Sequence, residues 1–308
     1  MLSFQQFILE QETQGQLQRL ALAVSIDMPD NEYIYDSKYN VSKMFNLITK
    51  DDKNIQPSEM PVFNYSNWKV EKMIEDGYNP DLIYNSIEAK QKVSSKKEWH
   101  KLHEKSSYTP NIAFTKGDIK NLAFPVIAKP DNRYAGQGIV VFKKPDELVD
   151  AKLEQFSIFS EKIDIKEELR IFCWKGRPLM HVYRVPANEE TKNLSKKADD
   201  KLKFNYELAT DKIKGELADV VQEFSEVHRD LCFYSIDAVI DQEGKPYVIE
   251  MSSEPGPIFG VMGHVYKEMY QDHYKEALSA EANRMIDKYI ESDINQTINS
   301  DRERFKIR

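Results

Sequence analysis

Two apolar runs near residue 240, each interrupted by a single acid, constrain the fold of this chain most strongly. The runs are FYSIDAVI and YVIEMS, and they contain Asp237 and Glu250. The polar stretch between them includes Gly244, so the pattern predicts two antiparallel strands joined by a tight turn. Carboxylates that face each other on paired strands stand within about 5.5 Å and repel unless a cation lies between them. The hairpin therefore predicts a divalent-cation site, the alternative being two acids exposed to water.

A second feature is a lysine inside another apolar strand. Lys129 lies in FPVIAKP, and the segment after it, DNRYAGQGIVVF, contains Gly136 and Gly138 before a further strand. A buried lysine is costly unless an anion neutralises it, and a glycine-containing loop lets backbone amides approach phosphate oxygens. A bulged hairpin would need the same glycines. Lysine and loop together favour a phosphate site.

The remaining pattern alternates strands with helices and predicts the α+β class. The turn between two long strands contains Gly176, for which we expect a positive φ. His100 and His103 lie in a Lys- and Glu-rich helical stretch, which favours a helix face in water over a metal site. The expected strands are LALAVSI, FPVIAKP, GIVVFKK, SIFSEKI, ELRIFCWKG and PLMHVYRVP, and the expected helices are residues 1–20, a helix stopped at Gly77, residues 87–106, PDELVDAKLEQF and about 211–230 capped by Thr210.

Composition excludes several classes of function. There are 43 Lys and Arg against 51 Asp and Glu, a net charge of −8, which argues against a nucleic-acid partner. No apolar run is long enough for a membrane helix, and no leader peptide is visible, so we expect a cytoplasmic protein. The opening MLSFQQFILEQ resembles proteins of tailed phages, which favours a phage-encoded protein acting in the bacterial cytoplasm. Cys173 and Cys232 lie in apolar runs and are expected to be buried thiols.

From about Ser86 to Val265, the order of elements and four separate motifs resemble the ATP-grasp enzymes, which are ATP-dependent carboxylate ligases with two α+β lobes around ATP. The resemblance implies an ATP-grasp fold preceded by a smaller N-terminal α/β domain. It implies an N-terminal domain at 1–85, a small lobe with the Gly-rich loop at 86–160, a large lobe with the metal site at 161–265, and a C-terminal helix and polar tail at 266–308.

The resemblance also implies roles for single residues around the nucleotide. SSKKEWHKL matches the segment with the family's first phosphate lysine, with Lys97 the first choice and Lys96 the second. AGQGI stands at the Gly-rich flap, IFSEKI at the strand that binds adenine, and EELRIF at the ribose acid. The residues implied to hold ATP are Lys97, Lys129, Gly136, Gln137, Gly138, Glu161, Lys162, Ile163 and Glu168.

The same comparison implies the catalytic, metal and substrate residues. Arg170 would face the transferring phosphate, and Asp237 and Glu250 would bind one or two Mg²⁺ ions. The family usually has Asn two residues after the second acid, where this chain has Ser252, a poorer ligand. HVYRVP and TKNLS resemble the subgroup of peptide and ribosomal-protein glutamate ligases, although Lys196 and Lys197 replace the glycines of that subgroup. The substrate-side residues implied are Arg184 and Asn193, with backbone amides near Gly256.

The expected activity is therefore an ATP-dependent ligase that joins a carboxylate to an amine through an acyl phosphate and releases ADP and phosphate. The substrates would be small molecules or peptides. The lysine-rich segment Asn188–Lys203 is either a solvated loop or the wall of a pocket for an acidic substrate. Two alternatives stay open: a phosphotransferase on the same fold, and a nucleotide-binding scaffold without turnover. A homo-oligomer is equally open.

Overall fold

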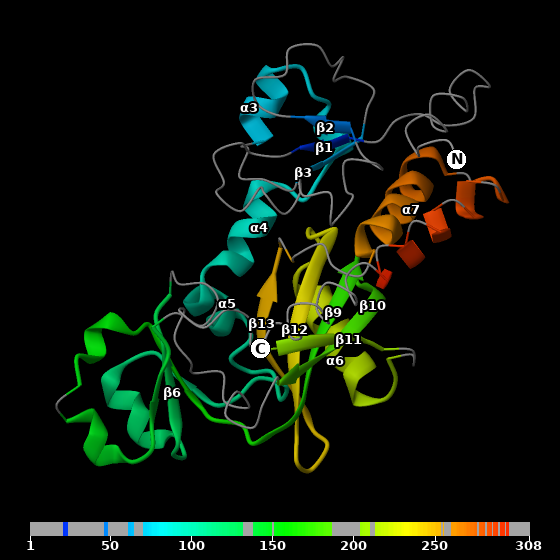
Figure 1. Cartoon of the computed structure of the whole chain (residues 1–308). Coiled ribbons are helices and arrows are strands. Elements are labelled where there is room, and N and C mark those ends of the chain that lie inside the picture. The colour runs from blue at the N-terminus through cyan, green and yellow to red at the C-terminus, as the bar shows by residue number, and fades with distance from the viewer. Residues whose placement is uncertain are drawn as a thin grey trace, which may run out of the picture. The chain divides into compact units, whose positions relative to one another are not determined.

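The chain folds into two compact units, each formed by separate stretches of sequence (Figure 1). One unit comprises Met1–Ala89, Arg229–Phe233 and Glu254–Arg308, and the other comprises Lys90–His228 and Tyr234–Ser253. The fourfold division expected from the sequence stays a prediction. The computed structural model describes residues 21–23, 46–48, 61–64, 70–131, 138–149, 151–186, 204–209, 213–253, 255, 260–275, 277–280, 282–284, 286–288, 290–292 and 294–295.

The first unit contains a parallel sheet with the strand order β2-β1-β3-β4. Helix α3 ends as predicted before Gly77, whose φ is 94° and whose N–H donates to the carbonyl of Ile74. The predicted helix over residues 1–20 lies outside the described residues. The elements are β1 (Ala21–Ala23), β2 (Asn46–Ile48), β3 (Val62–Asn64), α3 (Val70–Glu75), the 3-10 turn η4 (Pro80–Leu82), β4 (Ile83–Tyr84) and α4 (Ile87–Ser94), which continues into the second unit.

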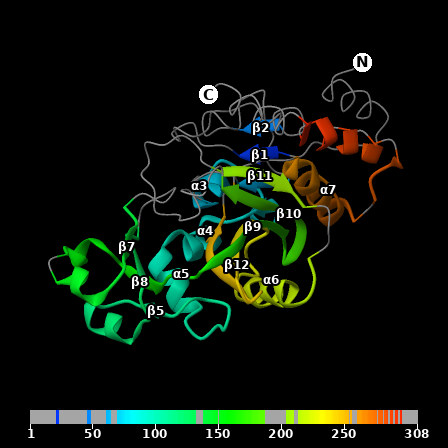
Figure 2. The same ribbon diagram turned by 60° about the horizontal axis from the view of Figure 1, so that its bottom comes forward.

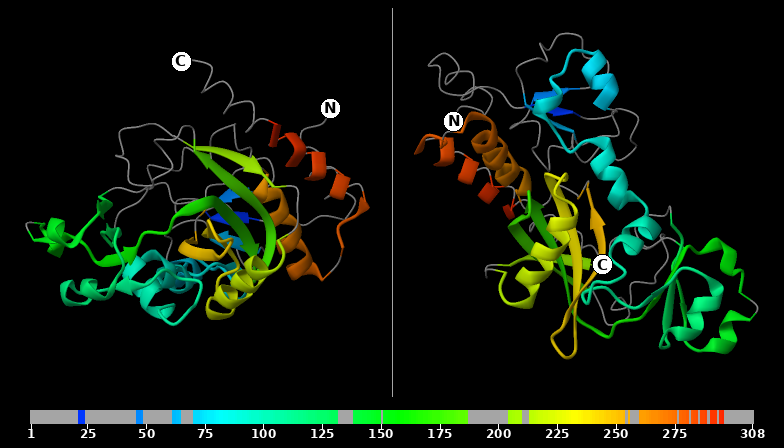
Figure 3. Two further views of the ribbon diagram at one scale, coloured as in Figure 1. Left: turned by 90° about the horizontal axis from the view of Figure 1, so that it is seen from below. Right: turned by 180° about the vertical axis from the view of Figure 1, so that it is seen from behind.

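Asn85 joins two distant stretches of the first unit. Its side-chain amide donates to the carbonyl of Phe233 at 2.6 Å, and its amide oxygen accepts the N–H groups of Cys232 and Phe233 at 2.7 and 3.0 Å. In the same unit, helix α7 (Val261–Tyr274) lies beside the described helical residues between 280 and 295 (orange and red in Figure 3). A Cβ on Gly263 would stand 2.5 Å from Ile290, so glycine permits this close packing.

The second unit contains a small antiparallel sheet with the order β5-β8-β6-β7 (green in Figure 2). PDELVDAKLEQF was predicted to form a helix, but it forms two 3-10 turns. Leu148 and Leu153 are five residues apart, so two separate turns bring them to the same core, while Val149 is 74% exposed. The elements are β5 (Ile112–Ala113), η5 (Lys116–Asn121), β6 (Val126–Lys129), β7 (Val140–Phe142), η6 (Pro145–Leu148), η7 (Leu153–Gln155) and β8 (Ile158–Glu161).

A larger sheet of the second unit has the order β11-β10-β9-β12-β13 (Figure 1). Its first hairpin turns at Lys175 and Gly176, with φ values of 44° and 81°, which confirms the positive φ predicted for the glycine. Helix α6 begins after Gly215, and the predicted cap Thr210 lies outside the described residues. The elements are β9 (Ile165–Trp174), β10 (Arg177–Pro186), β11 (Phe204–Leu208), α6 (Glu216–Val227), β12 (Phe233–Asp241) and β13 (Pro246–Ser252).

Helix α5 (Lys96–Leu102) corrects one prediction. His100 and His103 are buried, at 1% and 3% exposure, rather than solvated. Together with Trp99 they form the helix's inner stripe, and the Trp99 ring stacks on Phe224 of α6 with centroids 5.8 Å apart. The Nε2 atoms of His103 and His228 are 2.9 Å apart. The aromatic stripe, rather than the flanking lysines, decides which face is inside.

Two further expectations concern the chain as a whole. Cys173 is buried and Cys232 is half-buried, and neither forms a disulfide, as predicted. Within the described residues, no helix combines the length and the apolar character needed to cross a bilayer. Helices and antiparallel sheets together confirm the α+β class.

Candidate functional site

One face of the large sheet carries a row of polar side chains from β12 and β13. Asp237 pairs with Glu250 across the hairpin, and Ser235 pairs with Ser252. Because side chains alternate along a strand and opposite residues share a face, all four lie on the same side. Tyr234 hydrogen-bonds to Ser225 of α6, so α6 covers the opposite side. The predicted pair of acids is therefore brought together.

The neighbouring strand β9 adds positive charge to this face. Arg170 donates to both carboxylate oxygens of Asp237, each at 2.7 Å. Burial alone would raise the pKa of Asp237, but the charge and hydrogen bonds of Arg170 lower it overall. Beside this pair, Arg184 of β10 contacts Glu168 of β9, and burial raises the pKa of Glu168 although Arg184 opposes the change. Two charge-assisted pairs thus lie side by side.

Two lysines reach the acids from the other elements of the unit. The Nζ atom of Lys96, in the first turn of α5, lies 3.1 Å from Glu250 Oε1. Lys129, at the end of β6, is half-buried, and burial lowers its pKa; Glu250 raises that pKa and Lys96 lowers it further. Lys129, Asp237 and Glu250 are thus collected in one site, as the sequence predicted. Of the two candidate lysines in SSKKEWHKL, Lys96 is the one whose ammonium contacts an acid of the site.

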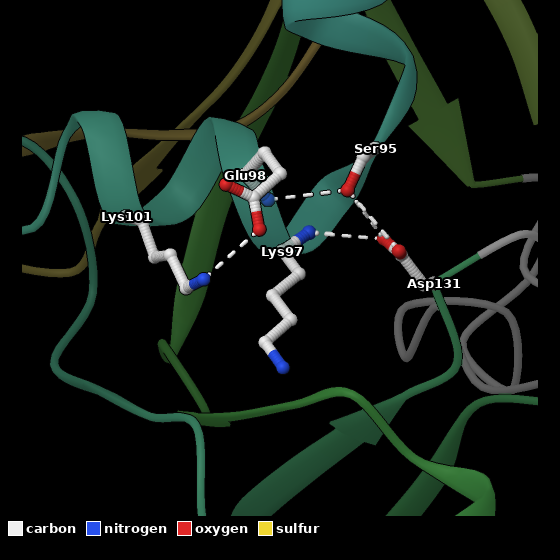
Figure 4. Close-up of polar contacts among 5 residues, drawn as sticks. All are labelled: Ser95, Lys97, Glu98, Lys101 and Asp131. Atoms are coloured by element: carbon white, nitrogen blue, oxygen red, sulfur yellow. Dashed lines mark hydrogen bonds and ion pairs between the residues drawn. The ribbon is translucent and has the colours of Figure 1, made fainter.

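Asp131 fixes both lysines in one local framework (Figure 4). Its carboxylate accepts the Ser95 hydroxyl at 3.1 Å and the backbone N–H of Lys97 at 3.0 Å. Ser95 in turn caps α5 by accepting the N–H of Glu98 at 3.2 Å. The Lys97 side chain extends away from Asp131. The residue two positions after Lys129 therefore ties the end of β6 to the start of the helix that carries Lys96.

The other predicted nucleotide residues are placed as follows. Gly138 has a φ of 74°, and a Cβ there would stand 3.1 Å from Pro130. The Glu161 carboxylate accepts the N–H of Ala123 at 2.7 Å and the side-chain amide of Asn111 at 2.9 Å. The backbone N–H of Lys162 donates to Pro125, and Ile163 is half-buried. Glu161 thus fastens the small sheet. Four predicted residues lie outside the described residues: Gly136, Gln137, Asn193 and Gly256.

Three residues of the site were missed from the sequence: Asp131, Ser235 and His100. His100 lies one turn after Lys96, and its buried Nδ1 atom has no hydrogen-bond partner. Burial, and then the charges of Lys129 and Lys96, lower its pKa well below 6.5. The signal that could have found His100 is its place in the aromatic stripe one helical turn from a lysine. Asp131 carries no comparable signal, because an acid after a proline is common in turns.

The donor set was tested against the implied magnesium ion. Asp237 and Glu250 offer carboxylate oxygens, and Ser252 a hydroxyl, on one face. Magnesium prefers such hard oxygen ligands and usually takes one or two carboxylates, with substrate phosphates completing the shell. No cluster of three or more His, Cys, Asp and Glu side chains suited to a metal occurs among the described residues. The site therefore fits a magnesium ion bound together with a phosphate ligand.

Comparison with known proteins gives the same architecture. A curated relative, the D-alanine–D-alanine ligase of Trichlorobacter lovleyi, is 25% identical over 181 residues, covering 51% of this chain and 56% of that protein. The chain thus spans just over half of that relative's length. The D-alanine–D-alanine ligase structure from Bacillus anthracis matches with a TM-score of 0.56 at 14% identity, covering 89% of this chain and 100% of the other. The ATP-grasp ligase PsnB with a minimal precursor matches at 0.53 and 12% identity, covering 91% and 100%.

These matches confirm the ATP-grasp fold expected from the motifs. A family model for the ATP-grasp domain, the third family of its clade, matches residues 79–254, which is more than half of the chain. The chain belongs to the ATP-grasp family, in this third family of the clade.

Proposed function

We propose that the chain is an ATP-dependent ligase that joins a carboxylate to an amine and releases ADP and phosphate. The observation that carries the proposal is the meeting of Lys96 and Lys129 with the opposed pair Asp237 and Glu250. Cations and acids interleaved in this way suit a metal-bound polyphosphate. The names of the relatives, D-alanine–D-alanine ligase and ATP-grasp ligase, support the same reaction class.

The chemistry requires two steps because a carboxylate cannot expel oxide when an amine attacks it. In the first step a carboxylate oxygen forms a bond to the γ-phosphorus of ATP while the bond to the bridging oxygen breaks and ADP leaves. In the second step the amine nitrogen bonds to the acyl carbon, the carbon–oxygen bond breaks, and phosphate leaves. The proton lost by the nitrogen departs to solvent with the phosphate. One ATP is consumed for each amide formed.

The residues of the site would act through position and charge rather than through covalent chemistry. Lys96 and Lys129 would hold the phosphates, and Arg170 would balance charge on the transferring group, in the electrostatic manner of phosphoryl transfer. Magnesium, when bound, neutralises charge on the phosphate oxygens. Asp237 and Glu250 would hold that ion, and the contact of Arg170 with Asp237 would keep the guanidinium beside it.

We further propose an acidic acceptor, such as a glutamate-containing peptide. The lysine-rich segment Asn188–Lys203 supports this choice by its charge, although it lies outside the described residues. We expect an acidic peptide to react faster than its amidated counterpart, and the difference to shrink with added salt because exposed charges are screened. Equal rates for both peptides would remove the acidic-acceptor proposal and leave the ligase proposal standing.

The reaction class is tested by isotope transfer. The chain would be incubated with magnesium, ATP and paired amino acids or peptides, screening for phosphate release that requires both an acid and an amine. For an active pair, ¹⁸O in the carboxylate should appear in the released phosphate, because the acyl phosphate gives up one carboxylate oxygen. Mass spectrometry should show an amide product lighter by one water than the two substrates together. Lys129→Met serves as the inactive control.

The two alternatives give other results in the same assay. A phosphotransferase would move phosphate to a single acceptor without any need for an amine. A scaffold would show no acid- and amine-dependent ADP release, and an unmodified chain that fails to bind ATP would contradict every enzymatic reading.

A further inference from the structure

A buried hydroxyl group on β12 has no hydrogen-bond partner. Ser235 is 0% exposed, and its Oγ is one of few buried side-chain atoms in the described residues that lack a partner. A buried polar group without a hydrogen bond costs about 1–3 kcal/mol, so alanine would be the more stable residue at this position. An orphaned hydroxyl in a well-packed strand points to a ligand of its own.

The strand geometry fixes the direction of this side chain. Ser235 lies two residues before Asp237, so both project from the same face of β12. Tyr234, between α6 and the strand, projects from the other face. Across the hairpin, Ser235 is paired with Ser252, as Asp237 is paired with Glu250. Its hydroxyl therefore lies in the row of polar groups that forms the proposed metal site.

A hydroxyl oxygen suits the ion expected there. Magnesium takes neutral oxygen ligands beside its carboxylates, including the serine or threonine hydroxyl of phosphate-binding loops. In this chain Ser252 replaces the larger Asn amide of the resembling enzymes, which leaves the site short of one neutral oxygen. We propose that Ser235 is a further metal ligand, and that the opposed hydroxyls of Ser235 and Ser252 together supply the neutral oxygens. This inference rests on the proposed ligase function.

The first test measures metal binding instead of turnover. Mn²⁺ would be titrated into the full chain with a non-hydrolysable ATP analogue and followed by electron paramagnetic resonance and calorimetry. Ser235→Ala should weaken Mn²⁺ binding about tenfold while leaving the metal-free protein as stable as the parent, or more so. Ser225→Ala is the matched control, since that buried hydroxyl is hydrogen-bonded to Val221 and Tyr234. It should lower stability and leave the Mn²⁺ affinity unchanged.

A second variant tests direct coordination. Ser235→Cys keeps the side-chain size but replaces a hard oxygen with a soft sulfur, so it should weaken Mn²⁺ binding and favour Cd²⁺ relative to the parent. Unchanged Mn²⁺ affinity in both variants overturns the inference and leaves the ligase proposal intact. A stability loss in Ser235→Ala as large as that of Ser225→Ala would mark a structural role and also overturn it. If the parent binds no Mn²⁺ with the nucleotide, both proposals fall.

Discussion

At the scale of single residues, every acid of the site is already matched by a cation. Arg170 neutralises Asp237, and Lys96 contacts Glu250. Opposite charges in contact favour the ionised carboxylates that a metal requires, and this is why the pKa of Asp237 stays low in spite of burial. Binding of a metal and a polyphosphate would then exchange these partners: the acids would turn to the metal and the cations to the phosphates.

Lys96 and Lys97 should differ sharply when each is removed. We predict that Lys96→Ala raises the KM for ATP about tenfold or more, because a charge-assisted contact to phosphate contributes about 1.5–3 kcal/mol. Lys97→Ala should stay within about twofold of the parent, because that ammonium points away from Asp131 and only its backbone N–H is used. Steady-state kinetics at varied ATP would measure both. A larger effect from Lys97 would restore the original sequence assignment.

This pair of lysines shows where sequence reasoning stops at the residue scale. The motif located the right stretch of helix, but adjacent residues differ by about 100° around a helix axis. Deciding between them required knowing that Ser95 caps the helix and that Asp131 holds its first turn. Asp237 and Glu250 were easier, because strand alternation and a short turn already determine that opposed residues share a face.

At the scale of elements, Asp131 acts as a clamp between β6 and α5. We predict that Asp131→Ala destabilises the protein by about 1–2 kcal/mol, since a helix loses its capping interactions and the half-buried Ser95 loses its partner. The KM for ATP should rise as well, because Lys96 and Lys129 lose their common framework. Asp131→Asn, which keeps one acceptor oxygen, should recover much of both losses. Urea unfolding and ATP kinetics of the two variants provide the comparison, and an unchanged KM in Asp131→Ala would argue against the positioning role.

The junction between the ends of α5 and α6 should make the protein sensitive to acid. Burial, followed by the neighbouring His228, lowers the pKa of His103 from 6.5 to about 4. The unfolded chain therefore binds the proton more readily, so stability is full above pH 6.5 and falls as the pH drops towards 4. His103 alone should cost up to about 2 kcal/mol between pH 7.5 and pH 5.

Urea unfolding at these two pH values would measure that loss, with Trp99 beside His103 as the fluorescent reporter. His103→Gln should show a flatter dependence on pH. His100, which is buried next to Lys129 and Lys96, adds a loss of the same sign and remains in the variant. An equal slope in parent and variant would contradict the assignment to His103.

Elements with a strong period were predictable, and short irregular ones were not. The hairpins at Gly176 and Gly244 follow from alternating apolar strands around a glycine that adopts a positive φ. The turns at Pro145–Leu148 and Leu153–Gln155 were mistaken for a helix because leucines and lysines have good helix propensity. There the small core needed only a few side chains delivered at separate points, and packing outweighed propensity.

At the scale of the whole molecule, the described residues proposed to bind metal and phosphate all belong to one unit. Lys96, Lys129, Arg170, Asp237 and Glu250 lie within Lys90–His228 and Tyr234–Ser253, although the chain leaves this unit and returns to it. The sequence motifs marked this part well, because its chemistry demands particular residues. The sequence could not show that residues 229–233 join the other unit, since that depends on the contacts of Asn85 across nearly 150 positions.

This organisation predicts where a nucleotide stabilises the protein. Ligand at one hundred times its Kd stabilises the state that binds it by about 2.7 kcal/mol. We expect hydrogen exchange to slow on addition of magnesium and a non-hydrolysable ATP analogue in α5, β6, β12 and β13, which contribute the binding groups. Exchange in β3 and α3 should change much less, because those elements contribute none. Lys129→Met should abolish the protection without altering exchange in the absence of nucleotide, whereas equal protection in both units would show that binding is coupled throughout the chain.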